Sequence, residues 1–203
     1  MPVTKSHAKS PYRAQLFFVG LILIIGISRH LPLSHPEWFN FSPVLSLFLI
    51  SGAMLKGVWS WIAPILAVFV TDLVLNPSYG VSFLEPFMLA TSFSYLLVFL
   101  LGKFLVKAKT LGILIGGGIV GALTFHIVTC SFAWWGNPAY AKSLIGLFQA
   151  ITVGQPGFPP AYLFLKNTLI SSIIFTTAIG WFALRIQEPV ATSRVKSSAA
   201  RAN

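Results

Sequence analysis

The sequence predicts an all-α protein, an integral membrane bundle of six transmembrane helices. Of its 203 residues, 56% are hydrophobic and only 9% are charged, whereas soluble domains carry roughly 25% charged residues. Six apolar segments are candidates to cross a hydrocarbon core about 30 Å thick. The basic residues gather in the short segments that flank these stretches. Water is therefore not the main solvent of this chain.

The first predicted helix covers about residues 14–29 and follows a basic tail, residues 1–13. A signal peptide is the alternative interpretation of this region. However, Arg29 and His30 follow the apolar stretch, where a cleavage site needs small residues. We therefore expect a helix that is not cleaved.

The second predicted helix covers about residues 42–56. The hydroxyl of Ser42 can cap it, and Pro43 takes the first helical position, where its missing N–H costs nothing. The third helix covers about residues 58–75. It ends before the sequence NPSYG, because the residue that precedes a proline disfavours the helical conformation.

The fourth predicted helix covers about residues 85–106 and ends among lysines, which suit a helix C-terminus and lipid headgroups. The fifth covers about residues 110–135 and contains GILIGGGIVGA, where small residues recur four apart and let helix backbones approach closely. The sixth covers about residues 160–185. The apolar part of residues 136–159, SLIGLFQAITVG, is too short to span. We expect it to lie in the membrane interface or to dip back into the bundle.

Six crossings place both termini on the same side, and the basic residues indicate which side. Eleven of the 14 lysines and arginines fall on the side of the termini: Lys5, Lys9, Arg13, Lys56, Lys103, Lys107, Lys109, Arg185, Arg194, Lys196 and Arg201. The positive-inside rule therefore places both termini in the cytoplasm, with residues 187–203 as a disordered tail. Topology and contact with membrane lipid explain the net charge of +10, so we expect no nucleic-acid partner.

Ionisable groups inside a membrane segment are costly, so each becomes a candidate functional residue. Asp72 lies near the outer end of the third predicted helix, and Asn76 follows one turn later on the same face. On the sixth helix, Lys166 and Asn167 lie about two turns from the outer end, and Lys166 could pair with Asp72. The structural alternatives are hydrogen bonds from a neighbouring connector to Asp72 and bonds between helices for the others.

His126 lies within the fifth predicted helix, on one face with Gly118, Ala122 and Cys130. The small residues leave room there either for a ligand or for a neighbouring helix. A packing role for the histidine is the alternative. His126 and Cys130 provide fewer than the three or four ligands that a zinc site requires, so we expect no metal site. A single cysteine also excludes an internal disulfide.

The connector RHLPLSHPEWFNFSP, residues 29–43, is the most polar part of the predicted outer face. Polar groups beside aromatic rings are typical of small-molecule sites, although an interfacial belt also explains tryptophans. We expect Arg29 to reach the headgroup region from the end of its helix. The predicted substrate-binding residues are His30, His35, Glu37, Trp38, Asn40, Asp72, Asn76, His126, Trp134, Lys166 and Asn167.

Motifs of the common enzyme classes are absent from the sequence. It contains no G-x-x-x-x-G-K-[ST] phosphate loop, no G-x-S-x-G and no H-E-x-x-H. An intramembrane enzyme that uses His126 would lack a nucleophile or a second catalytic group. We therefore expect no enzymatic activity, no catalytic residue and no cofactor.

Four blocks carry a resemblance to known proteins: RHLPLSHPEWFNFSPVLSLFLISGAML, TDLVLNPSYG, FHIVTCSFAWWGNPAYAKSLIGLFQA and PAYLFLKNTLISSIIFTTAIGWFAL. Over residues 29–184 the chain resembles a family of uncharacterised bacterial membrane proteins. That family in turn resembles the substrate-binding S components of energy-coupling-factor vitamin transporters in helix count, size and placement of outer loops.

This resemblance implies a multi-pass protein of the bacterial cytoplasmic membrane. It would bind a vitamin-like or metal-related small molecule from the outer side, and a transporter transmembrane subunit with ATPases would be its partner. Asn40, Asp72, His126 and Asn167 would occupy regions comparable to the S-component binding site. The alternative is a non-catalytic structural or assembly subunit that packs against a larger membrane complex through the glycine face of the fifth helix.

Overall fold

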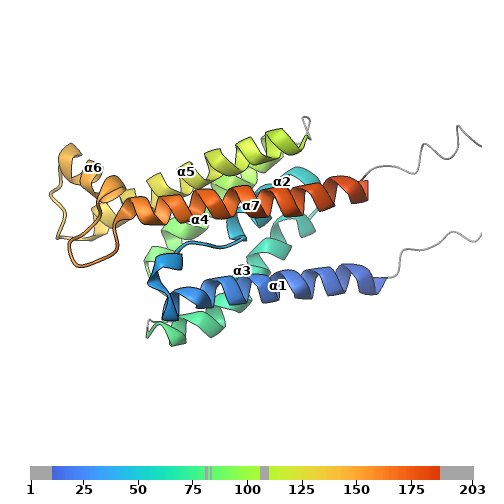
Figure 1. Cartoon of the computed structure of the whole chain (residues 1–203), viewed down its shortest axis with the longest axis horizontal. Helices are drawn as coiled ribbons and strands as arrows, with labels where there is room; N and C mark the ends of the chain where they lie inside the picture. Colours follow the sequence, from blue (N-terminus) through green and yellow to red (C-terminus); the bar gives the residue numbers. More distant parts are fainter. Residues whose placement is uncertain (1–10, 81, 83, 106–109, 188–203) are drawn as a thin grey trace, which may run out of the picture.

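The computed structural model describes residues 11–80, 82, 84–105 and 110–187, with the backbone alone at residues 11–22, 186 and 187. The described residues form helices and no strands. In chain order these are α1 (Pro11–Ser34), the short 3-10 helix η1 (Pro36–Trp38), α2 (Val44–Met54), α3 (Trp59–Ser78), α4 (Phe87–Phe104), α5 (Leu111–Gly136), α6 (Leu144–Thr152) and α7 (Ala161–Gln187). Figure 1 shows that α1 begins and α7 ends at the same end of the bundle, whereas α6 lies at the opposite end.

Four of the described helices, α3, α4, α5 and α7, are long and apolar enough to cross a membrane. Large apolar side chains on their outer faces are exposed, among them Val74, Leu89 and Val120. Such faces suit lipid rather than water. The helices therefore make the chain a multi-pass membrane protein, as predicted from its composition.

The helix α2 differs from the predicted second span, because it is only 11 residues long and every one of them is buried. At about 1.5 Å per residue it covers roughly half of a hydrocarbon core. The prediction of a helix over residues 42–56 was therefore too long. The helix ends before Leu55, whose backbone is extended. The chain then changes direction at Gly57, whose φ is +69°. On the other side, residues 39–43 run into the bundle without helical structure.

Two glycines allow α2 to pack tightly against α4. A Cβ atom at Gly52 would lie 2.2 Å from the Phe99 carbonyl oxygen, and one at Gly102 would lie 2.1 Å from the Leu49 carbonyl oxygen. No real Cβ atom tolerates such distances, so the two backbones meet only because both positions are glycine. The sequence analysis did not single out this pair.

The glycines of α5 confirm the predicted close approach of helices in part. A Cβ atom at Gly117 would meet Leu105, one at Gly118 would meet Thr176, and one at Gly121 would meet Val98. By contrast, Gly112 and Gly116 have no such neighbour within 4 Å. Most of the glycine face therefore packs within the chain, and only its N-terminal part points outward.

Other predicted boundaries shift by several residues. The helix α1 continues past residue 29 and through Pro32 to Ser34, and α3 continues through Pro77 to Ser78. A proline close to a helix end removes only one terminal hydrogen bond, so both helices tolerate it. Residues 136–159 contain α6. Of the predicted tails, residues 11–13 belong to α1 and residue 187 ends α7, while the rest lies outside the described residues.

Candidate functional site

A cavity of about 510 Å³ is lined by residues of α1, α3, α4, α5 and α7, where residues 39–45 lead into α2. Its lining combines aromatic rings, hydroxyl and amide groups, and two charged side chains. The lining residues are Ser28, Arg29, Pro32, Phe39, Asn40, Phe41, Ser42, Val44, Leu45, Leu75, Asn76, Tyr79, Glu85, Phe87, Thr91, Tyr95, Phe125, Thr129 and Thr168.

Residues 39–45 border the cavity and are held in place by α7. The side-chain amide of Asn167 donates to the Glu37 carbonyl oxygen at 2.6 Å and to the Phe39 carbonyl oxygen at 2.9 Å. The ring of Phe39 also contacts that of Phe164, with 5.6 Å between centroids. Asn167 is buried, so it fixes the connector at the border of the cavity without itself lining it.

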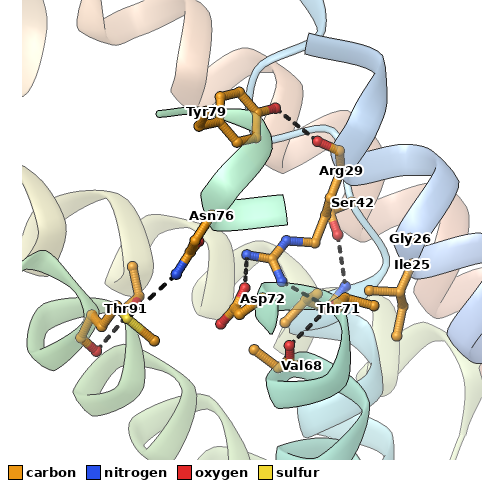
Figure 2. A network of polar contacts seen from close by, with 12 residues as sticks. Ile25, Gly26, Arg29, Ser42, Val68, Thr71, Asp72, Asn76, Tyr79 and Thr91 are labelled. Carbon is orange, nitrogen blue, oxygen red and sulfur yellow. Dashed lines mark hydrogen bonds and ion pairs between the residues drawn. The ribbon is translucent and has the colours of Figure 1, made fainter. Parts of the chain in front are cut away.

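Arg29 reaches from α1 to α3 at the edge of the cavity (Figure 2). Its guanidinium forms an ion pair with the Asp72 carboxylate and donates a hydrogen bond to the Thr71 hydroxyl at 2.9 Å. The two charged side chains are 24% and 12% exposed. The charge of Arg29 is therefore balanced by an acid of the same chain.

The predicted pairing of Asp72 with Lys166 was wrong, because Arg29 takes that place and Lys166 is exposed. The reason lies in the length of α1. Since this helix continues five residues past Arg29, the side chain enters the bundle instead of reaching for the membrane surface.

Tyr79, at the C-terminal end of α3, makes a second contact between α3 and Arg29 of α1. Its hydroxyl donates to the Arg29 carbonyl oxygen at 2.8 Å (Figure 2). Burial raises the pKa of the Tyr79 phenol above its ordinary value, although Arg29 opposes this shift. The phenol therefore keeps the proton that it donates.

Most hydroxyl groups of the lining use their hydrogen within their own helix. Thr91 donates to the Met88 carbonyl at 3.1 Å, Thr129 to the Phe125 carbonyl at 2.8 Å, and Thr168 to the Phe164 carbonyl at 2.7 Å. Ser28 donates to the Ile25 carbonyl at 2.9 Å. A hydroxyl has one hydrogen and two lone pairs, so these groups offer mainly acceptors to a ligand.

Aromatic rings form much of the apolar lining. Tyr95 stacks between Phe48, at 4.9 Å, and Phe125, at 5.8 Å between centroids. Phe41 packs edge-on against Phe175 at 5.7 Å. These contacts hold the rings in place, which favours binding of a flat or apolar ligand.

Of the eleven predicted site residues, Asn40 and Asn76 line the cavity. Asp72 and Asn167 lie behind it, where one holds Arg29 and the other holds the connector. The amide of Asn76 also contacts the Met88 sulfur at 3.9 Å, and Asn40 takes a positive φ of 64°.

The remaining predicted residues are not brought together at this cavity. His126 Nε2 lies 2.7 Å from the Ile151 carbonyl oxygen and so links α5 to α6. The Trp134 indole N–H donates to the Ala141 carbonyl at 2.8 Å. His35 and Glu37 are exposed and pair with each other at 3.1 Å. Trp38 and Lys166 are also exposed. His30 lines a separate apolar groove between α1 and α3.

Sequence reasoning missed several lining residues, above all Glu85, Thr91, Tyr95 and Thr129. A signal for some of them exists in the spacing: Thr91 and Tyr95 lie four residues apart on α4, as do Phe125 and Thr129 on α5. Each pair therefore shares one helix face. Among the described residues, no group of three His, Cys, Asp or Glu side chains could hold a metal ion.

Comparison with known proteins places the chain in a family. No curated protein and no solved structure matches it. One family model matches residues 9–192, which is nearly the whole chain. The chain therefore belongs to the family of unknown function DUF6580.

Proposed function

We propose that this protein binds a small molecule in the cavity beside residues 39–45 and serves its uptake from the outer side, in the manner of an S component. The observation that carries the proposal is the cavity itself. Its volume of about 510 Å³ falls within the roughly 300–1,000 Å³ typical of small-molecule sites. Its lining joins fixed aromatic rings to a few polar groups, the combination that such sites use.

The position of the cavity supports the same function. It lies next to the connector between α1 and α2, far from the end where α1 begins and α7 ends. With both termini in the cytoplasm of a bacterium, the cavity opens to the outer side. Because α2 is short, the connector takes the place of its missing outer half and can act as a cover.

Two tryptophan substitutions on α4 test the proposal. Thr91 lines the cavity, whereas its neighbour Ser92 is exposed on the outer face of α4. Thr91→Trp should fill the cavity and abolish both ligand retention, measured by native mass spectrometry, and thermal stabilisation by a panel of vitamins and metal complexes. Ser92→Trp should leave both unchanged. Equal ligand retention in the two variants would contradict the proposal.

The alternative is a structural or assembly subunit, and one observation favours it. Gly112 and Gly116 lie four residues apart on α5 and point outward, since a Cβ atom at either position would have no neighbouring atom within 4 Å. This is the spacing at which a partner helix can approach. Native mass spectrometry separates the two functions. Association with a transporter subunit and ATPases supports uptake, whereas a stable complex with other subunits, lost in Gly116→Leu, supports assembly.

A further inference from the structure

The charges around the cavity do not cancel. Two charged side chains line it, Arg29 and Glu85. Arg29 is paired with Asp72, so these two groups contribute no net charge. Glu85 lies just before α4 and is partly buried, and no cation pairs with it among the residues that the structure describes. The formal charge of the site is therefore negative, in a chain whose net charge is +10.

The hydrogen bonds of the lining also favour a positively charged ligand. The Ser42 hydroxyl accepts from the Val44 N–H, whereas the hydroxyls of Ser28, Tyr79, Thr91, Thr129 and Thr168 all donate to backbone carbonyl oxygens. Their lone pairs are what remains for a ligand. Asn40 and Asn76 supply amides, which can accept as well as donate. A ligand rich in N–H donors fits this lining better than one rich in acceptors.

The aromatic rings add a third, independent contribution. Phe41 and Phe125 line the cavity, as does Tyr95, whose ring is stacked between those of Phe48 and Phe125 and so offers its edge rather than a face. The face of an aromatic ring carries negative charge density and attracts a cation within about 6 Å of its centre. The same rings would also contact the apolar body of a ligand.

From these three observations we infer that the ligand is a small organic cation, an ammonium or protonated nitrogen attached to an apolar or aromatic body. This inference rests on the proposed binding function. Glu85 pairs with the positive nitrogen, the hydroxyl oxygens of Thr91 and Thr129 accept from its N–H groups, and the rings surround the rest of the molecule. An anion would need Arg29, which Asp72 already holds.

Matched probes that differ only in charge test the inference. Tryptamine is a cation, tryptophol is its neutral analogue and indole-3-acetate is an anion; benzylamine, benzyl alcohol and benzoate form a second set. Binding is measured by calorimetry on the full chain in nanodiscs of zwitterionic lipid. We expect each amine to bind at least about tenfold more tightly than its alcohol, as a charge-assisted hydrogen bond contributes more than a neutral one.

Variants of Glu85 identify the group responsible. Glu85→Gln should remove the preference for the amine and leave the affinity for the alcohol unchanged, while Glu85→Asp should retain part of the preference. Glu188→Gln removes the same charge directly after α7 and serves as the control, which should behave as the wild type. Thermal unfolding of each variant checks that it is folded.

The outcomes separate this inference from the proposed function. Equal affinity for amine and alcohol, or tighter binding of the carboxylates, overturns the cationic ligand and leaves small-molecule binding intact. A preference for the amine that persists in Glu85→Gln also overturns it. If no probe of either set binds and no small molecule is released from the purified protein, the proposed function fails, and the inference fails with it.

Discussion

At the scale of single residues, the ionisable groups of the bundle are used mainly to hold elements in position. Asp72 balances Arg29, and His126 links α5 to a carbonyl of α6. Hydropathy and residue type were enough to select both Asp72 and His126 as unusual. They were not enough to choose their partners, since a partner depends on where each helix ends. Glu85 was not selected because it lies at the end of a predicted helix, where an ionisable side chain is not costly.

The ion pair between Arg29 and Asp72 predicts a characteristic double-mutant result. Asp72→Asn leaves a partly buried guanidinium without its counterion and should lower the free energy of unfolding by about 3 kcal/mol. The double variant Arg29→Met with Asp72→Asn removes the stranded charge as well, so it should recover part of this loss. Reversible unfolding in detergent measures all the variants, including Arg29→Met alone. Strictly additive effects of the two substitutions would show that the pair is not coupled.

Asn167 predicts a local effect on the connector. Asn167→Leu removes the two hydrogen bonds that the Asn167 amide donates to the carbonyl oxygens of Glu37 and Phe39. Each lost hydrogen bond should lower the free energy of unfolding by about 1 kcal/mol or more. Hydrogen exchange of the backbone amides in residues 37–42 should become faster, and a bound ligand should dissociate sooner. The exposed neighbour Lys166 provides the control, since Lys166→Gln should change neither rate. Unchanged exchange in Asn167→Leu would mean that the connector is held by its ring contacts alone.

At the scale of helices, the sequence located the long apolar elements but set the ends of some of them several residues short. The predicted helices over residues 85–106 and 110–135 match α4 and α5 within two residues at each end, because basic residues and Thr110 mark their limits. The predicted end of α1 fell short because the helix continues past its apolar stretch to Ser34. The predicted end of α3 fell short because Pro77 was taken to stop a helix whose last turn accommodates it. The predicted helix over residues 42–56 exceeds α2 by two residues at each end, because Ser42 and Pro43 were taken as its cap and first helical position and Lys56 as its end.

The crossing of α2 and α4 predicts a strong requirement for glycine. In Gly52→Ala or Gly102→Ala the new methyl group would overlap a backbone carbonyl of the other helix, which no rotamer change can relieve. We expect a loss of at least about 1–3 kcal/mol in the free energy of unfolding, as found for overpacked cores. Gly116→Ala is the matched control. That position is open, so alanine should be neutral or should stabilise α5 by up to about 1 kcal/mol. Equal effects at all three positions would contradict this packing.

At the scale of the whole molecule, composition is enough to predict a helical membrane protein, because so few charges and so many apolar residues leave no other class. A small-molecule site beside the connector of residues 29–43 stays a prediction, and the structure has a cavity at this connector. Its lining could not be listed in advance, since it is assembled from α1, α3, α4, α5 and α7 by packing that no local pattern encodes. The short α2 is one reason why the lining could not be predicted, because the length of α2 determines how far the connector enters the bundle.

The direction in which the cavity opens follows from the topology of the chain, which cysteine labelling can measure. Cys130 is the only native cysteine, so Cys130→Ser provides an unreactive background. Ser78 and Lys56 lie near opposite ends of α3, and both are exposed. With the termini in the cytoplasm, Ser78→Cys should react with a membrane-impermeant maleimide on intact spheroplasts, whereas Lys56→Cys should react only after permeabilisation. The opposite pattern would turn the cavity toward the cytoplasm, and capture of a ligand from outside would then be excluded, whatever its charge.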